Sequence, residues 1–175
     1  MTALETGRMR LEPLRADDAG VMFEGLSNTR LYAFIEEEPP ASVEALRARY
    51  QRLESRLSPG GDESWLNWVI LTKPDLGARG YVQATVCGES ASIAYVLFED
   101  AWGQGLAKEA VQVMLVHLRD AWSVRTARAT VDPRNLRSVR LLERLHFALA
   151  QTRRGQAPLR GVLAHEVDYV LRMDT

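Results

Sequence analysis

The sequence predicts an α+β fold: one central mixed sheet, mostly antiparallel and twisted, flanked by helices. Three strand patterns follow one another between residues 64 and 98 with only short turns between them, which is typical of an antiparallel meander. A long apolar helix pattern separates this meander from a strand pattern at 126–131, and such a crossover joins parallel strands. A chain of 175 residues, 46% of them hydrophobic, can bury one core of this kind, so we expect a single domain over residues 1–175.

The N-terminal part predicts one strand and two helices. Residues 8–14 alternate as a strand, and the acidic pair at 17–18 is typical of the cap of a helix that runs to about Leu26. A second helix begins at Ser42 and ends before Pro59. Its apolar face comprises Val43, Leu46, Tyr50, Leu53 and Leu57.

The meander is expected to use strands at 64–72, 78–87 and 91–98, with a hairpin at Gly88 and Glu89. Its first strand is apolar on both faces, so both faces should be covered. The elements that follow are a helix over 105–120, the strand 126–131, a second crossover helix over 135–145, and a closing antiparallel pair, 147–153 with 163–172, around a turn at 155–161.

Composition excludes several classes of function. A net charge of −1 argues against general nucleic-acid binding, and no stretch approaches the ~20 apolar residues of a membrane span. The N-terminus lacks the apolar run of a secretory signal, so we expect a cytoplasmic protein. The single cysteine, Cys87, cannot form an internal disulfide and is expected to serve packing, and the three histidines lack metal-ligand spacing, so no metal is expected.

The charge is nevertheless uneven. Arginines gather between residues 119 and 160, whereas Glu36, Glu37 and Glu38 stand together in the N-terminal part. Both runs are compatible with a solvated surface. They are also compatible with a basic side for the phosphates of a nucleotide and an acidic lip for a cationic substrate.

The stretch from Trp102 to Lys108 is the strongest functional signal from local chemistry. Gly103 and Gly105 allow a tight turn just before a helix, and the N–H groups that follow have no helical carbonyl to bond. Together with the helix dipole, these donors predict a phosphate or pyrophosphate site at residues 104–108. The spacing fits neither a Walker loop nor the dinucleotide fingerprint.

This loop, read as Trp102-Gly-Gln-Gly-Leu-Ala107, resembles motif A of the GNAT acyltransferases, and its Trp and the following Glu109-Ala110 resemble the RimJ/RimL-like N-acetyltransferase branch. A second block, with Asn135-x-x-Ser138 opening a helix that closes in Leu145-His146-Phe147, resembles the same family. His146 replaces the family's glycine there, and histidine tolerates a left-handed backbone better than most residues, so the turn should survive.

The resemblance implies acetyl-CoA as co-substrate and direct attack by a primary amine in a ternary complex, with no metal. It implies contacts of the cofactor with the strand end at Val96, Leu97 and Phe98, with Asn135, and with Arg140. The loop would contribute Trp102, Gly103, Gln104, Gly105, Leu106, Ala107 and Lys108. Asn135 and Ser138 share a helix face, and in RimL-like members this serine protonates the leaving thiolate; both could instead be ordinary helix caps.

The expected acceptor is a peptide or protein α-amino group or a small-molecule amine, and the protein is expected to be a monomer or homodimer without nucleic-acid or membrane partners. Glu36, Trp68 and Gln83 are candidate substrate residues, and Tyr95 is a candidate catalytic residue. The Trp and Tyr side chains could equally belong to the core.

One departure concerns catalysis. The position of the family's general base, a glutamate, holds Ala157. A substitute could be Tyr95, a chain of waters, one of the acidic residues 36–38, or Glu166. The alternative to an enzyme is a catalytically weak acyl-CoA-binding regulatory module with the same fold.

Overall fold

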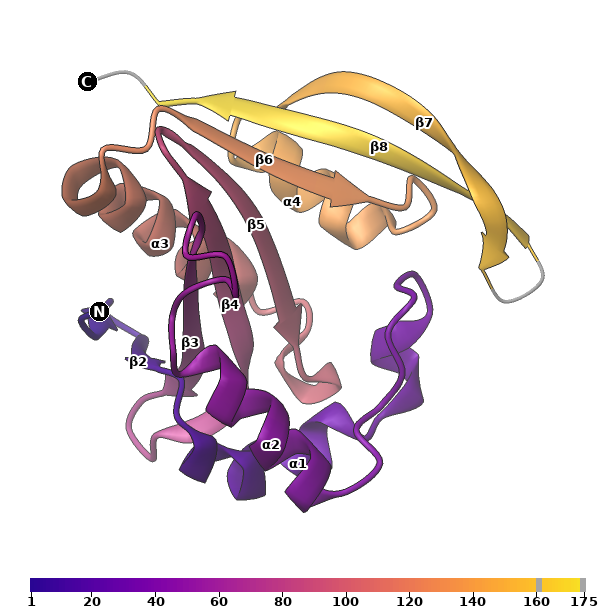
Figure 1. Ribbon diagram of the computed structural model, residues 1–175. Coiled ribbons are helices and arrows are strands. Elements are labelled where there is room, and N and C mark those ends of the chain that lie inside the picture. The colour runs from indigo at the N-terminus through magenta and orange to yellow at the C-terminus, as the bar shows by residue number, and fades with distance from the viewer. Residues whose placement is uncertain (160–161, 174–175) are drawn as a thin grey trace.

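The computed structural model describes residues 1–159 and 162–173, with only the backbone described at 153–159 and 162–165. Within these residues eight strands form one sheet in the order β1-β2-β3-β4-β5-β6-β8-β7 (Figure 1). The strands are β1 (Leu4–Glu5), β2 (Met9–Pro13), β3 (Ser64–Thr72), β4 (Gly77–Cys87), β5 (Ser90–Leu97), β6 (Thr126–Val131), β7 (Ala148–Leu159) and β8 (Val162–Arg172). The α-helices are α1 (Ala19–Leu26), α2 (Val43–Leu53), α3 (Leu106–Trp122) and α4 (Leu136–Arg144).

The predicted mixed sheet is confirmed. Every pair of neighbouring strands described is antiparallel except β5 and β6, which the α3 crossover joins in parallel. The closing pair β7–β8 lies at one edge, where the long antiparallel arm is visible in yellow and orange in Figure 1.

Helices cover both faces of the sheet. On one face Leu66, Trp68 and Ile70 of β3 pack in a core cluster with the apolar side of α3 and with Leu142 of α4. On the other face Val69 packs in a cluster with residues of α1 and α2. The expectation that β3 is covered on both faces is therefore confirmed.

The sheet splits between β5 and β6. Their parallel register extends only over Ser90–Ser92 against Thr126–Arg128. Beyond these pairs β5 continues to Leu97 and β6 to Val131, and the two ribbons diverge (Figure 1). The divergence leaves one side of each strand end without a strand partner, so both can line a site.

Some boundaries differ from the sequence-based expectations. The helix expected to reach Leu57 ends at Leu53, because Arg56 has a left-handed backbone (φ 58°) and Leu57 pairs with Ser64 in an isolated bridge. The short strand β1 and the 3₁₀ turn Thr29–Tyr32 were not predicted.

The closing hairpin and the cysteine also differ. β7 runs to Leu159 through a register shift between Arg154 and Pro158, so Gly155 lies in a strand rather than in the expected turn; 160–161 lie outside the described residues. Cys87 at the end of β4 is exposed rather than packed.

Candidate active site

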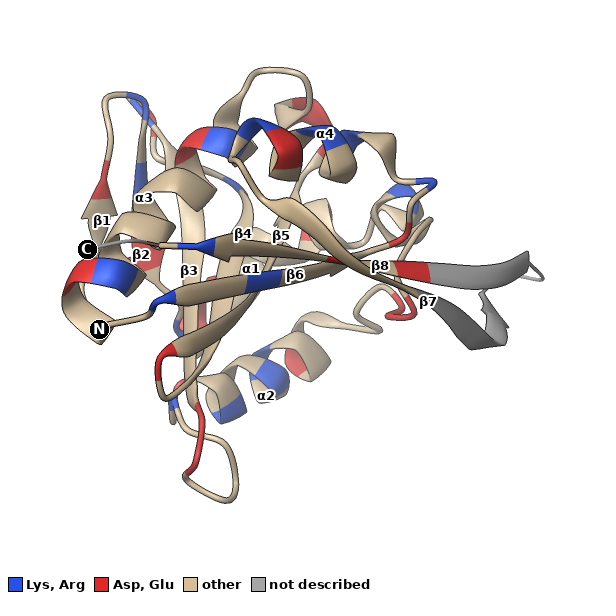
Figure 2. Cartoon of the chain, turned by 90° about the horizontal axis from the view of Figure 1, so that it is seen from above, with Lys and Arg blue, Asp and Glu red and all other residues tan. Residues whose placement is uncertain are grey.

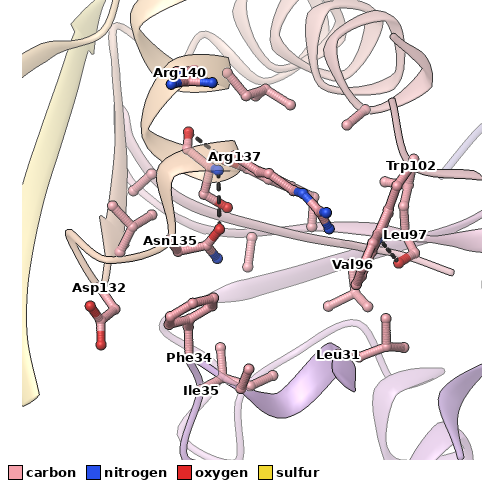
Figure 3. Close-up of a pocket in the computed structure, with 18 of the residues that line it drawn as sticks. Leu31, Phe34, Ile35, Val96, Leu97, Trp102, Asp132, Asn135, Arg137 and Arg140 are labelled. Atoms are coloured by element: carbon pink, nitrogen blue, oxygen red, sulfur yellow. Dashed lines mark hydrogen bonds between the residues drawn. The ribbon is translucent and has the colours of Figure 1, made fainter. Parts of the chain in front are cut away.

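A cleft of about 1180 Å³ lies where the sheet splits. The start of α3 and the loop before it line it on one side, and α4 lines another. The ends of β5 and β6 contribute further wall, and the segment 30–37 after α1 closes it opposite α4 (Figure 3). Most of the residues expected from the sequence lie in this cleft.

The loop before α3 has the geometry that its glycines predict. Gly103 and Gly105 both have φ 76°, a left-handed conformation that costs an L-residue about 1–2 kcal/mol. Gly105 is the N-cap of α3, so the N–H groups of Leu106, Ala107 and Lys108 begin the helix without a partner inside it. These three residues and both glycines line the cleft, whereas Gln104 does not; its side-chain amide donates to the Asp100 carbonyl at 2.6 Å.

Trp102 forms a wall of the cleft between two cations. Its indole N–H donates to the Leu97 carbonyl at 2.9 Å. The guanidinium of Arg137 lies 4.2 Å from the ring centroid (Figure 3), and that of Arg30 lies 5.8 Å away, so both are within cation–π range. Arg30 also pairs with Glu99, so contacts link segment 30–37, the loop and α4 around one ring.

Several elements contribute positive charge to the cleft, and α4 contributes more of it than any other. The cations that line the cleft are Arg30, Lys108, Arg134, Arg137, Arg140 and Arg144. Those of α4 appear as blue bands along that helix in Figure 2. Arg140, expected at the cofactor, is among them.

Of the three residues expected at the cofactor near the end of β5, two line the cleft and one does not. Val96 and Leu97 line the cleft. Phe98 does not, because it is buried in the cluster on the α1–α2 face and its N–H donates to the Arg79 carbonyl at 2.8 Å. The Phe98 N–H is therefore already used, and the alternation of an antiparallel pair turns the Val96 N–H toward β4 as well, which leaves the Leu97 N–H as the candidate backbone donor on this strand.

Asn135, Ser138 and Tyr95 lie together in the cleft. The Asn135 side chain caps α4 by accepting from the Ser138 N–H at 3.2 Å, so asparagine is the cap and the serine hydroxyl has no capping role. The Tyr95 hydroxyl donates to the Ser138 carbonyl at 3.4 Å. Burial raises the pKa of the Tyr95 phenol to about 12, although a hydrogen bond with the Ser138 side chain acts in the opposite direction.

Segment 30–37 contributes apolar and acidic side chains to the cleft. Leu31, Phe34 and Ile35 lie across it from Asn135 and Arg137 (Figure 3). The sequence reasoning missed these three, because the segment after α1 has no periodic pattern to place it. Further lining comes from Glu36, Glu37, Tyr81, Gln83 and Glu166.

Two acceptor candidates differ in position. Gln83 of β4 lines the cleft as expected. Trp68 is fully buried in the core, where its indole N–H donates to the Thr2 carbonyl at 3.0 Å and its ring meets His117 edge to face. Trp68 does not line the cleft, because it packs in the core between the sheet and α3.

The residues that could replace the family's general base differ in protonation and in contacts. Tyr95 stays protonated near neutral pH because of its raised pKa, so it can donate but not accept a proton there. Glu36, Glu37 and Glu166 all line the cleft. Glu37 differs from the other two in its ion pair with Arg49 of α2, at 3.0 Å. Ala157 lies in β7, where only the backbone is described.

Neither a metal nor a membrane span has support in the described part of the chain. It contains no group of three or more His, Cys, Asp or Glu side chains placed to hold a metal ion. None of its helices combines the length and apolar character needed to cross a bilayer.

Comparison with known proteins gives a consistent result. The family model described as an acetyltransferase (GNAT) domain matches residues 8–148. An uncharacterized N-acetyltransferase, p20, from Bacillus licheniformis is 26% identical over 147 residues, which cover 84% of this chain and 83% of that protein.

Two solved structures extend the similarity to the whole fold. RimL, an alpha-N-protein acetyltransferase of ribosomal L7/L12 solved in complex with coenzyme A, superposes with a TM-score of 0.88 at 17% identity, covering 99% of both chains. An acetyltransferase from Salmonella typhimurium that modifies the N-terminal serine of L7/L12 gives a TM-score of 0.85 at 17% identity, covering 99% of this chain and 100% of that one.

Proposed function

The chain belongs to the GNAT acetyltransferase family, and from this premise we propose that it transfers the acetyl group of acetyl-CoA to a primary amine. The observation that carries the proposal is the combination of features that line one cleft. The α3 N-terminus, the arginines of α4, Ser138 and Tyr95 all line it, and segment 30–37, with its apolar and acidic side chains, lies across from α4. A nucleotide-bearing donor and a cationic acceptor could therefore bind in the same cleft and meet there.

The N-terminus of α3 and the arginines of α4 fit coenzyme A. The N–H groups at the start of α3 would bind the pyrophosphate, and the helix dipole favours its negative charge. Arg140 and its neighbours on α4 are placed for a further phosphate, and the ends of the split strands offer backbone groups to an extended arm. When bound, the co-substrate supplies a thioester, whose acetyl carbon is open to attack by an amine.

Leu97, Ser138 and Tyr95 have complementary roles. The backbone N–H of Leu97 would polarise the thioester carbonyl, as an oxyanion donor does. As the amine nitrogen bonds to the acetyl carbon and the carbon–sulfur bond breaks, the departing sulfur needs a proton. The Ser138 hydroxyl is the donor we propose, and it regains through water the proton that the amine loses. Tyr95 holds the Ser138 carbonyl and remains protonated.

The acceptor we propose is an α-amino group of a peptide, or a small amine of similar basicity. With Ala157 at the family's glutamate position, removal of the amine proton depends on Glu36, Glu166 or water. A lysine side chain with a pKa of about 10.4 needs a strong base, whereas an α-amino group at about 7.7–8.0 is partly neutral already. The two acetyltransferases compared above, which act on protein N-termini, support an α-amino acceptor.

A thiol-release assay with acetyl-CoA tests the proposal. The panel should contain peptides with free N-termini, the same peptides with blocked N-termini and a free lysine, small amines and aminoglycosides, with products located by mass spectrometry. We expect acetylated N-termini and a rate that rises with pH until the amine is deprotonated. Acetylation confined to lysine side chains would reject the proposed acceptor.

The same experiment separates the enzyme from the regulatory module. Binding of coenzyme A by calorimetry without thiol release from any amine would favour the module. Thiol release that depends on an amine would exclude it.

A further inference from the structure

Arg8, at the beginning of β2, joins the N-terminal strand to the loop before α3. Its Nη1 donates to the Gln104 carbonyl at 2.9 Å, and its Nε donates to Oε2 of Glu109 at 2.7 Å. Its Nη2 lies 2.5 Å from the same carboxylate oxygen. One guanidinium thus holds both the loop and the first turn of α3, although about a hundred residues separate Arg8 from them in sequence.

The contact with Gln104 determines how the next peptide is oriented. The 104–105 peptide is not among the cis bonds of the chain, and in a trans peptide the carbonyl and the following N–H point in opposite directions. Because the Gln104 carbonyl points at Arg8, the Gly105 N–H points away from Arg8. Gly105 lines the cleft and Arg8 does not, so this orientation directs the N–H toward the cleft.

This peptide needs an external anchor. Glycines flank Gln104 on both sides, and glycine adopts positive and negative φ with similar ease. A rotation of the 104–105 peptide would exchange the N–H for a carbonyl oxygen, which repels phosphate. The hydrogen bond from Arg8 opposes that rotation.

The contact with Glu109 addresses charge. Glu109 lies in the first turn of α3, where its carboxylate would repel an anion bound at the helix start. The pKa of Glu109 is lowered: partial burial acts to raise it, but hydrogen bonds with Thr6 and Arg8 and the charge of Arg8 outweigh that effect. The carboxylate is thus ionised at neutral pH, and Arg8 supplies the compensating charge.

We propose that Arg8 is a positioning residue for the pyrophosphate of coenzyme A: it fixes the 104–105 peptide with its N–H toward the cleft and neutralises Glu109. The proposal rests on the proposed function, because it takes the anion at the loop to be that pyrophosphate. Arg8 acts through the loop and does not itself line the cleft.

The test measures the affinity of the protein for coenzyme A by calorimetry in four variants. Arg8→Gln should weaken binding about 10-fold, as expected for the loss of a bond to a charged ligand. Arg8→Lys keeps the charge but not the fork, so its loss should be intermediate. Glu109→Gln keeps the contact with Gln104 and should bind within about 2-fold of wild type. Arg10→Gln, which removes an ion pair with Glu12 on the same strand, is the matched control and should bind as wild type does.

Acetyl-pantetheine provides the second measurement, because this thioester lacks the pyrophosphate. Arg8→Gln should raise KM for acetyl-CoA about 10-fold with little change in kcat, and leave kcat/KM for acetyl-pantetheine within about 2-fold. An equal loss with both donors would show that Arg8 merely supports the fold and would overturn the inference, as would unchanged affinity for coenzyme A in Arg8→Gln. If Arg8→Gln does not fold, the same comparison in Arg8→Lys decides. Wild-type protein that binds no coenzyme A would overturn the proposed function itself.

Discussion

Replacement of Gly105 separates the stability of the loop from its use as a phosphate site. The residue has φ 76°, and a Cβ built there would meet only Nη2 of Arg8 at 3.7 Å, an ordinary contact. Gly105→Ala is therefore strained by its backbone and not by crowding. The strain should cost about 1–2 kcal/mol, which lowers the melting temperature by about 2–8 °C in a chain of this size.

Gly88 offers a control with the same strain at a distance from the cleft. It has φ 55° in the β4–β5 hairpin, and nothing lies within 4 Å of a Cβ built there. Gly88→Ala should therefore lose similar stability without any effect on coenzyme A. Only at Gly105 can the loop relieve its strain by moving the N–H groups that we assign to the pyrophosphate.

Affinity distinguishes the two positions. Loss of one charge-assisted hydrogen bond costs about 1.5–3 kcal/mol, so Gly105→Ala should weaken binding of coenzyme A about 10- to 100-fold. Gly105→Val should weaken it further, because a β-branched residue tolerates positive φ least. Calorimetry on folded protein measures this. A folded Gly105→Val variant with wild-type affinity, or an equal loss in Gly88→Ala, would refute the reasoning.

Three further changes test the rest of the cleft. Ser138→Ala should lower turnover about 10- to 1000-fold in single-turnover kinetics while affinity for coenzyme A barely changes, since a thiol is already a fair leaving group; normal turnover would reject the proton-donor role. Tyr95→Phe should lower the plateau of the pH–rate profile without moving its midpoint, because a phenol with a pKa of about 12 does not titrate near neutrality; a shifted midpoint would contradict this. Gly80→Ala should cost about 2–4 kcal/mol of unfolding free energy in chemical denaturation, because its Cβ would lie 2.0 Å from the Val96 carbonyl oxygen at a φ of 137°; a loss no larger than that of Gly88→Ala would contradict it.

The mixed sheet could be predicted because local patterns determine most of it. Alternation along β3 and the crossover through α3 are properties of neighbouring residues, and both appear as expected. The left-handed turn at His146, which was expected from the resemblance to the family's Leu-Gly-Phe, is present, with φ 65°. The end of α2 was not, because the apolar spacing continues to Leu57 although the backbone turns at Arg56.

The candidate site was predictable where one short segment contains the whole signal. The glycine loop and the Asn135–Ser138 pair are of this kind. Trp68 and Phe98 show the limit, because alternation along a strand says which residues share a face but not which face meets the cleft. The Arg8 contacts depend on two segments far apart in sequence, so no local pattern could reveal them.

The segment between α1 and α2 has a consequence for how such a protein can diversify. Phe34 and its neighbours line the cleft, where we propose that the acceptor binds, while the proposed pyrophosphate site belongs to α3 and its loop. Ion pairs fasten it near both ends, Arg30 to Glu99 and Glu37 to Arg49. We expect that the residues between these two ion pairs can be replaced together. Recombination or directed evolution could then change the acceptor while the residues proposed to bind the donor stay the same.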